Sequence, residues 1–191
     1  MVSETVPSII DATGSECLIE TTLQGVRIRA AAKGARFRVR VAVLNLIGRV
    51  FMGTSDDPFR VADELVKSIG AEVRVRLVDM HAEATSEKSA MGWFLDGRVS
   101  AVVGTHTHVQ TADERILPGG TAFLSDIGMT GSYAGVIGME KDDVIARFTS
   151  VTSRRADHST GEVRICAALL DVDEQTGRAR EISRLSLRHE S

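Results

Sequence analysis

The residues of this chain best able to do chemistry are two histidines, His106 and His108, which stand one residue apart after a short apolar run. Histidine is the commonest metal ligand among side chains and titrates close to neutral pH. The run 101–103 is typical of a buried strand, and we expect Gly104 to break it. Such a pair can form a metal or catalytic site, or it can lie in solvent without a role, and the spacing alone does not decide between the two.

The elements that must position these histidines form an alternation of strands and helices. We expect strands at 37–46, 73–79 and 99–103, and helices at 58–69 and 85–96. Further along we expect a turn at 115–120, a strand at 121–126, a short helix at 142–148, and strands at 162–172 and 180–187 around a hairpin turn at 173–177. Before residue 37 only 25–30 reads as a strand. The alternation predicts an α/β fold whose neighbouring strands run parallel.

A third histidine, His81, follows the end of the second expected strand. Sites in sheets of this kind lie beyond the carboxyl ends of the strands. Neighbouring strands are about 5 Å apart, so His81 could meet His106 and His108 at one point. Packing explains a single histidine more easily than three at adjacent strand ends. The sequence therefore predicts a metal site made by these three residues.

Composition narrows the classes of function. The 191 residues suit one domain, and a formal charge of −3 gives no electrostatic case for binding a nucleic-acid duplex or an anionic membrane. The arginines of segment 27–40 are typical of a solvated face. No apolar run approaches the ~20 residues that span a bilayer, and the first residues lack the pattern of a signal peptide. Two cysteines are too few for a disulfide framework, so we expect a cytoplasmic protein.

Four segments carry a resemblance to a known family. They are VLNLIGRVFM at 43–52, HAEATSEK at 81–88, GTHTHVQTADERILP at 104–118 and DIGMTG at 126–131. In this order they resemble the YmdB-like bacterial metallophosphoesterases of the calcineurin-like superfamily. The resemblance runs from about residue 41 to about residue 184, and the segment around His106 is its most specific part.

The resemblance implies a layered α/β/β/α fold with a dinuclear centre of iron or manganese. It also implies hydrolysis of phosphodiesters, with 2′,3′-cyclic nucleotides as the substrate class. By position, His81 and His106 match ligands of one metal and His108 matches a ligand of the other. Two such metals would polarise the phosphorus centre and steady the leaving oxygen. Three carboxylates are near enough in sequence to orient the histidines from behind, namely Asp79, Glu83 and Asp126.

The chain also departs from the family. Residues 1–40 contain neither the strand ending in a metal-binding Asp, nor the Asn-Glu-Asn-type segment, nor the Gly-Asn-His segment that supplies the proton donor. No catalytic residue is therefore identified, at most one metal is expected, and the sheet is expected to be incomplete at the N-terminus. We divide the chain into an atypical segment, 1–36, and the C-terminal portion of a metallophosphoesterase domain, 37–191.

Two functions follow from this comparison. One is a metal-dependent phosphodiesterase, impaired in this chain, that acts on a small phosphodiester such as a cyclic nucleotide. The alternative is a truncated, non-catalytic remnant that keeps the three-histidine site and acts as a binding or regulatory module. In either case the resemblance suggests homo-oligomers, and nothing in the sequence indicates a membrane or a nucleic-acid duplex as partner.

Overall fold

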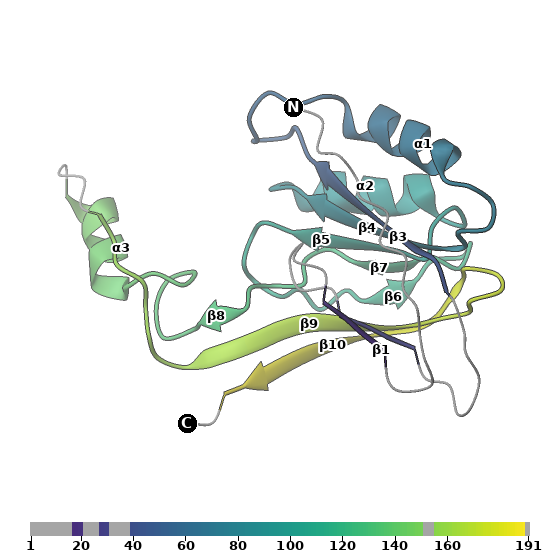
Figure 1. Ribbon diagram of the computed structural model, residues 1–191. Helices are drawn as coiled ribbons and strands as arrows, with labels where there is room; N and C mark the ends of the chain where they lie inside the picture. The colour runs from purple at the N-terminus through teal and green to yellow at the C-terminus, as the bar shows by residue number, and fades with distance from the viewer. Residues whose placement is uncertain (1–16, 21–26, 31–38, 151–154, 190–191) are drawn as a thin grey trace.

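The computed structural model describes residues 17–20, 27–30, 39–150 and 155–189 (Figure 1). In chain order the elements are β1 (Cys17–Glu20), β2 (Arg27–Ala30), β3 (Val41–Ile47), α1 (Pro58–Ser68), β4 (Val75–His81), α2 (Thr85–Leu95), β5 (Ala101–Thr105), β6 (Arg115–Ile116), β7 (Ala122–Leu124), β8 (Gly131–Ser132), α3 (Lys141–Thr149), β9 (Val163–Val172) and β10 (Ala179–Arg188). Within these ranges no helix is both long enough and apolar enough to cross a membrane.

The central sheet has five strands in the order β3-β4-β5-β7-β6. Its first four strands run parallel, as the strand–helix alternation predicts, and only β6 is antiparallel. The register sets Asn45 beside Asp79 and His81 beside Thr105. The carboxyl ends of β3, β4 and β5 therefore meet at one edge of the sheet.

The protein has three layers, with a hydrophobic core on each face of the central sheet. One core lies between α1, α2 and one face of the central sheet, and it includes Leu44, Val78, Met91 and Leu95. The other lies between the opposite face and the antiparallel sheet β10-β9-β8, and it includes Leu77, Val103 and Ile182. The expected α/β class is confirmed. Among the described elements α3 buries no residue and lies out beyond β8 (Figure 1), so three of the four expected layers are present in this part of the chain.

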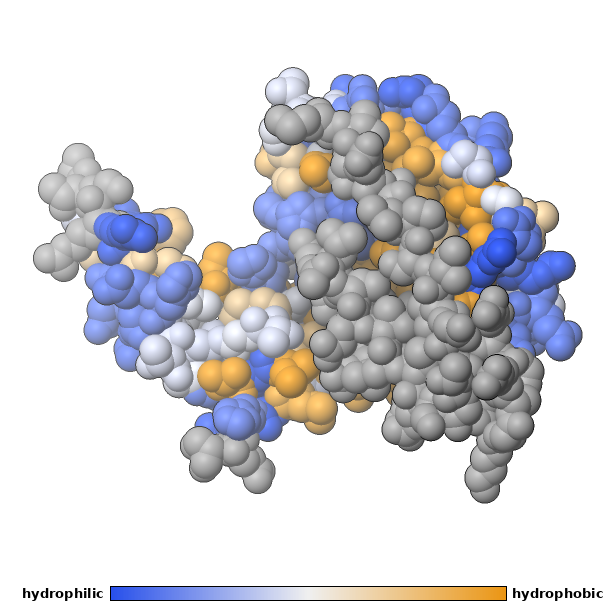
Figure 2. Space-filling view, in the orientation of Figure 1, coloured by the Kyte–Doolittle hydropathy of each residue, from blue (hydrophilic) through white to orange (hydrophobic). Residues whose placement is uncertain are grey.

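The two core helices form where their sequence predicts. The carboxylate of Asp57 accepts hydrogen bonds from the backbone N–H groups of Phe59 and Arg60, and Pro58 takes the first position, where no donor is needed. Figure 2 shows the result on the surface, where the outer side of α1 is hydrophilic and its flank toward the sheet is hydrophobic.

One inward-facing residue of the second helix was predicted wrongly. Met91 and Leu95 of α2 are fully buried, as expected, but Phe94 is 40% exposed. It lies at the rim, edge-on to Phe59, with Arg98 over its ring. The stripe that faces the sheet contains Lys88 instead, because residues 88, 91 and 95 share one side of a helix.

The strand that leads to the histidines lies two residues further along the chain than expected. Gly104 does not break β5, which continues to Thr105. A side chain at position 104 would lie 1.7 Å from the carbonyl oxygen of Ser125, so glycine is the residue that lets the strand continue there. Residues 115–120 were expected to form only a turn, but Arg115 and Ile116 pair with β7 as β6.

The N-terminal segment is described only in part. β1 and β2 form a separate antiparallel pair, and β2 lies within the predicted strand at 25–30. The division of the chain at residue 36 falls largely outside the described residues and stays a prediction.

The turn between β9 and β10 is held by Asp173. Its carboxylate accepts hydrogen bonds from the backbone N–H groups of Gln175 and Thr176, both at 2.9 Å, and from Arg180 at 2.6 Å. The backbone N–H of Thr176, followed by the guanidinium of Arg180, lowers the pKa of Asp173 to about 2. The carboxylate is therefore more acidic in the folded chain than in the unfolded chain, where its pKa is about 3.9.

Replacing Asp173 with asparagine is expected to lower the melting temperature at pH 7 and to matter less in acid. A depressed pKa stabilises the folded state above the unfolded pKa, and this stabilisation disappears as the pH falls from about 4 to 2. Melting curves of both proteins at pH 7, 4 and 2 measure the effect. Glu174→Gln removes the same charge from the same turn and is the control. An equal difference between wild type and Asp173→Asn at every pH would contradict the assignment.

Candidate metal centre

Two of the three predicted ligands meet at the carboxyl ends of β4 and β5. His81 is the last residue of β4, and His106 directly follows β5. Nε2 of His81 lies 3.1 Å from Nδ1 of His106, and the two rings are edge-on with centroids 4.8 Å apart. Both side chains are partly exposed, so a ligand can reach them from solvent.

His81 is oriented from behind by a chain of hydrogen bonds. The hydroxyl of Thr105 donates to Asp79 at 2.7 Å and lies 3.0 Å from Nδ1 of His81. Because that hydroxyl has used its proton, it accepts from Nδ1–H, which leaves a lone pair on Nε2 of the neutral imidazole. Asn45 donates to the other oxygen of Asp79 at 2.8 Å. Burial raises the pKa of Asp79 and lowers that of His81.

The ring of His106 is oriented in a similar way, by a contact with Glu83. A carboxylate oxygen of Glu83 lies 3.1 Å from Nε2 of His106, which can donate its proton there. The neutral ring then carries its lone pair on Nδ1, which faces His81. Two imidazole nitrogens that each carry a lone pair therefore lie 3.1 Å apart, and a proton or a cation shared by them relieves the repulsion between the lone pairs.

This geometry fits a metal ion held by two imidazoles. Nitrogen–metal bonds of about 2.1 Å that meet at about 95° span the observed separation of the two nitrogens. The carboxylate behind His106 is also the usual partner of a ligating histidine. Within residues 39–150 and 155–189, however, no group of three or more His, Cys, Asp or Glu side chains gathers as a metal site.

His108 does not join the other two histidines in the described structure. Its side chain is exposed, although its backbone lies near the pair. The turn that carries both residues is strained. Its φ angles are 106° at His106 and 66° at His108, and residues other than glycine rarely adopt such values. Strain of this kind persists where the surrounding structure imposes it, and it is concentrated at functional sites.

The three carboxylates expected to orient the histidines have different positions. Glu83 contacts His106 directly, and Asp79 reaches His81 through Thr105. Asp126 contacts neither ring. Its carboxylate instead accepts from the backbone N–H and the hydroxyl of Thr107, at 3.1 and 2.7 Å, and so holds the loop between the two histidines.

Lys88 is one of the residues supporting the site that sequence reasoning missed, with Thr105 and Asn45. Its ammonium donates to Asp126 at 2.8 Å and to the carbonyl of Thr105 at 3.0 Å, and both charged side chains are only 1% exposed. The pair joins α2 to the strand end that carries His106. The signal was present in the sequence, because Lys88 stands on the same helical stripe as Met91 and Leu95.

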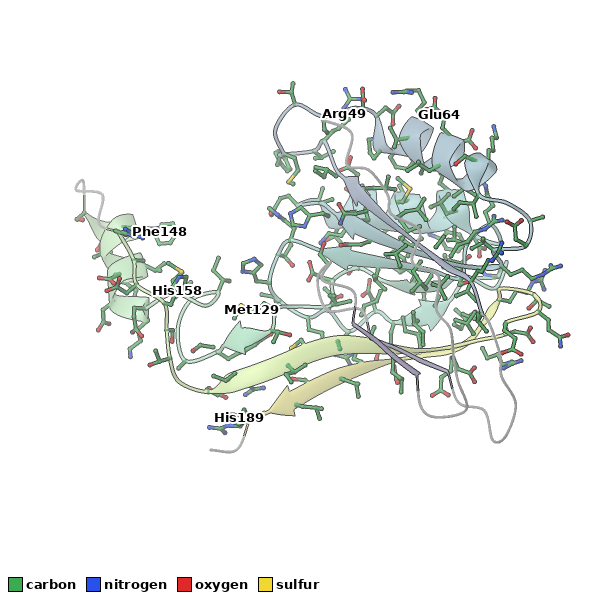
Figure 3. All side chains as sticks on the ribbon, viewed as in Figure 1. Arg49, Glu64, Met129, Phe148, His158 and His189 are labelled. Carbon is green, nitrogen blue, oxygen red and sulfur yellow. The ribbon has the colours of Figure 1, made fainter. Side chains whose placement is uncertain are left out.

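The loop after β3 also lies at this edge. The carboxylate of Glu87 accepts from the backbone N–H groups of Arg49 and Val50, and Gly48 donates to the carbonyl of His81. Arg49 is exposed in this loop (Figure 3). The remaining histidines, His158 and His189, are exposed and lie away from the site, as expected (Figure 3).

Comparison with known proteins identifies related sequences. The family described as YmdB-like protein matches residues 19–185. The chain is 50% identical, over 76% of its length, to a 2′,3′-cyclic-nucleotide 2′-phosphodiesterase of Bacillus subtilis, of which it covers 55%. It is 33% identical, over 73% of its length, to a protein of Mycoplasma pneumoniae named as a phosphatase/phosphodiesterase, of which it covers 50%. The chain thus spans about half the length of the curated relatives it matches.

Solved structures with the same fold are also known. A hypothetical protein from Thermus thermophilus superposes with a TM-score of 0.73 at 35% identity, covering 92% of this chain and 62% of that protein. A novel phosphatase from Mycoplasma pneumoniae superposes with a TM-score of 0.71 at 31% identity, covering 79% of this chain and 53% of the phosphatase.

Proposed function

Because the chain belongs to the YmdB-like protein family, we propose that it is a phosphodiesterase that hydrolyses small phosphodiesters with the help of divalent metal ions. The substrate class is 2′,3′-cyclic nucleotides, which the name of the Bacillus subtilis relative gives for that protein. The metal is iron or manganese. The observation that carries the proposal is the facing pair of imidazole nitrogens, 3.1 Å apart, at the carboxyl edge of the parallel sheet.

Each side chain of the site has a role in this proposal. His81 and His106 would hold the metal. His108 would be a further ligand by the family resemblance alone, because its exposed side chain does not join the pair in the described structure. Asp79, acting through Thr105, and Glu83 fix the ring orientations that present the lone pairs. Lys88 and Asp126 hold the strand end and the loop to which the histidines are attached. A divalent metal would supply charge stabilisation at the phosphorus centre and lower the pKa of an attacking water.

Hydrolysis of 2′,3′-cyclic AMP with added manganese tests the proposal. We expect turnover by the wild-type chain and a loss of at least about hundredfold in His81→Ala and His106→Ala. Calorimetric titration with manganese should show the same two variants binding the metal at least about tenfold more weakly. His158→Ala removes an exposed histidine elsewhere and should match the wild type in both measurements.

Unchanged hydrolysis in His106→Ala would contradict the proposal. Manganese binding that depends on both histidines, without turnover of the cyclic nucleotide, would favour the alternative of a non-catalytic binding module. The cytoplasmic location and a homo-oligomeric state belong to the same proposal, supported by the low cysteine content and by the family resemblance respectively.

A further inference from the structure

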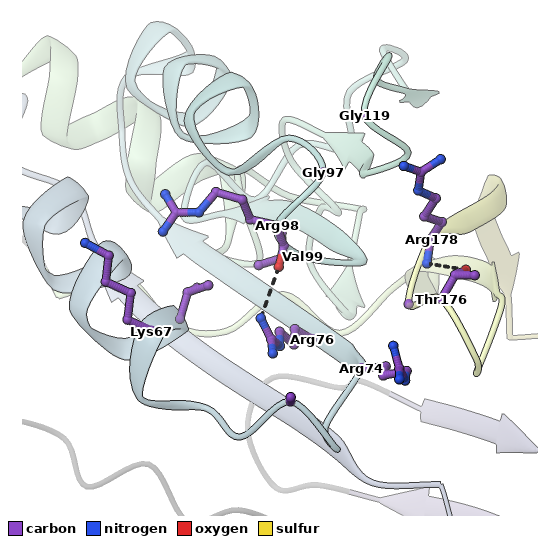
Figure 4. Close-up of a pocket in the computed structure, with 12 residues that line it drawn as sticks. Lys67, Arg74, Arg76, Gly97, Arg98, Val99, Gly119, Thr176 and Arg178 are labelled. Carbon is purple, nitrogen blue, oxygen red and sulfur yellow. Dashed lines mark hydrogen bonds between the residues drawn. The ribbon is translucent and has the colours of Figure 1, made fainter.

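A hollow lies at the edge of the central sheet opposite the histidines. It has a volume of about 540 Å³ (Figure 4). Its walls come from the end of α1, the start of β4, the loops that lead into β5 and β7, and the turn between β9 and β10. Six steps along β4 separate its rim from His81, a distance of about 20 Å. The hollow is therefore separate from the histidine site.

Cationic side chains dominate the lining. Five of them surround the hollow, namely Lys67, Arg74, Arg76, Arg98 and Arg178, and no aspartate or glutamate is among the lining residues (Figure 4). The protein as a whole carries a formal charge of −3, so this concentration of positive charge is local. Like charges around one hollow repel each other unless an anion lies between them.

Three of the cations are already engaged by the fold. Arg76 donates to the backbone carbonyl groups of Val73, Gly70 and Arg98. Lys67 and Arg98 share the carboxylate of Asp63, each at 2.6 Å. These contacts place the three cations firmly but neutralise only one unit of their charge.

The other two cations are not engaged within the part of the chain that the structure describes. The side chains of Arg74 and Arg178 make no hydrogen bond or ion pair with a described residue, and both are exposed. They are held near each other by Gly177, which has φ of 76° and packs directly against the backbone carbonyl of Arg74. The tight turn thus carries Arg178 to the side of the hollow where Arg74 lies (Figure 4).

The local charge remains positive after every opposing contribution is counted. Five cations less the carboxylate of Asp63 leave about four positive charges. The carboxyl ends of α1 and α2 also face this edge and contribute about half a negative charge each, so about three positive charges remain. The nearby carboxylate of Asp96 accepts only from neutral backbone N–H groups, among them that of Gly119, so its charge counts in full and about two positive charges remain. The carboxylate of Asp173 is already paired with Arg180.

We propose that this hollow binds a small anion that carries two or more phosphate groups. Guanidinium groups match phosphate oxygens with two parallel hydrogen bonds, and two unengaged arginines can take one phosphate each. The volume suits a ligand of about the size of a nucleotide. A nucleic-acid strand fits less well, because the cations converge on one hollow and do not form a stripe along the surface.

Titration calorimetry of the full chain with inorganic tripolyphosphate tests this site. The buffer contains a chelator, so that no metal at the histidines contributes and the result does not depend on the proposed phosphodiesterase activity. We expect binding that weakens about tenfold in Arg74→Gln and in Arg178→Gln, and about a hundredfold in the double variant. Arg188→Gln removes the same charge from the far end of β10 and should bind like the wild type.

Three results would overturn the proposal. The first is tripolyphosphate affinity that the double variant leaves unchanged while circular dichroism shows it folded. The second is evidence of unspecific attraction by charge. It would be a loss of tripolyphosphate affinity in Arg188→Gln as large as in Arg74→Gln, or binding of sulfate as tight as that of tripolyphosphate at the same ionic strength. The third is competition by single-stranded RNA that strengthens with the length of the strand, which would make the ligand a nucleic acid.

Discussion

Replacing Gly104 with alanine is expected to destabilise the protein by about 3 kcal/mol or more. The new methyl group would lie 1.7 Å from the carbonyl oxygen of Ser125 and 2.5 Å from the side chain of Lys88. The carbonyl group of Ser125 belongs to the backbone just after β7 and is buried, so it cannot move aside without displacing the neighbouring Asp126. Urea unfolding curves of the variant and the wild type measure the difference in the free energy of unfolding.

Gly131→Ala is the matched control for this prediction. A methyl group at position 131 meets nothing within 4 Å, and the backbone there does not require glycine. It should change the free energy of unfolding by less than about 1 kcal/mol. If Gly104→Ala were as stable as Gly131→Ala, the close packing of β5 against the end of β7 would be wrong.

Replacing Lys88 with methionine is the second large effect, with an expected cost of about 3 to 5 kcal/mol. Methionine keeps the packing of the side-chain stem but leaves Asp126 without its cation at a position that is 1% exposed. The carbonyl of Thr105 also loses a donor. The free energy of unfolding measured in urea reports this cost.

A double-mutant cycle separates the ion pair from simple packing. Asp126→Asn combined with Lys88→Met removes both charges, so the double variant should be more stable than the sum of the two single changes predicts. Strict additivity would mean that the two side chains do not depend on each other. The coupling should also be stronger than for the exposed pair of Lys67 and Asp63, which supplies the comparison.

The sequence predicts the arrangement of the parallel strands well, because hydrophobic periodicity reports which faces are buried. Periodicity together with the cap at Asp57 and Pro58 placed the first helix, and the turn residues at 173–177 placed the hairpin. Periodicity failed where contacts between distant segments decide the outcome. Glycine is needed at position 104 because Ser125, the residue after β7, comes so close to it. Phe94 lies at the surface, where its ring packs edge-on against Phe59 of a different helix.

The site was predictable in part for the same reason. His81 and His106 meet because parallel strands end at a common edge, which the sequence indicates. The roles of Thr105 and Asn45 as supports depend on the register between strands, and that register cannot be read from one strand alone. Lys88 was not singled out from the sequence because a charged residue on an apolar helical stripe usually lies at the edge of the stripe and is exposed to solvent. Its partner, Asp126, is distant in sequence.

The order of strands in the central sheet also constrains how the chain acquires its structure. Each parallel pairing, from β3 with β4 to β5 with β7, joins segments separated by a whole helix or a long loop. Such pairings lose chain entropy before they gain contacts, so they form slowly. The hairpin of β9 and β10 is local and can form early, but the apolar face it presents is covered only once the parallel strands have assembled. Until then that face is open to contact with other chains, which favours aggregation during folding.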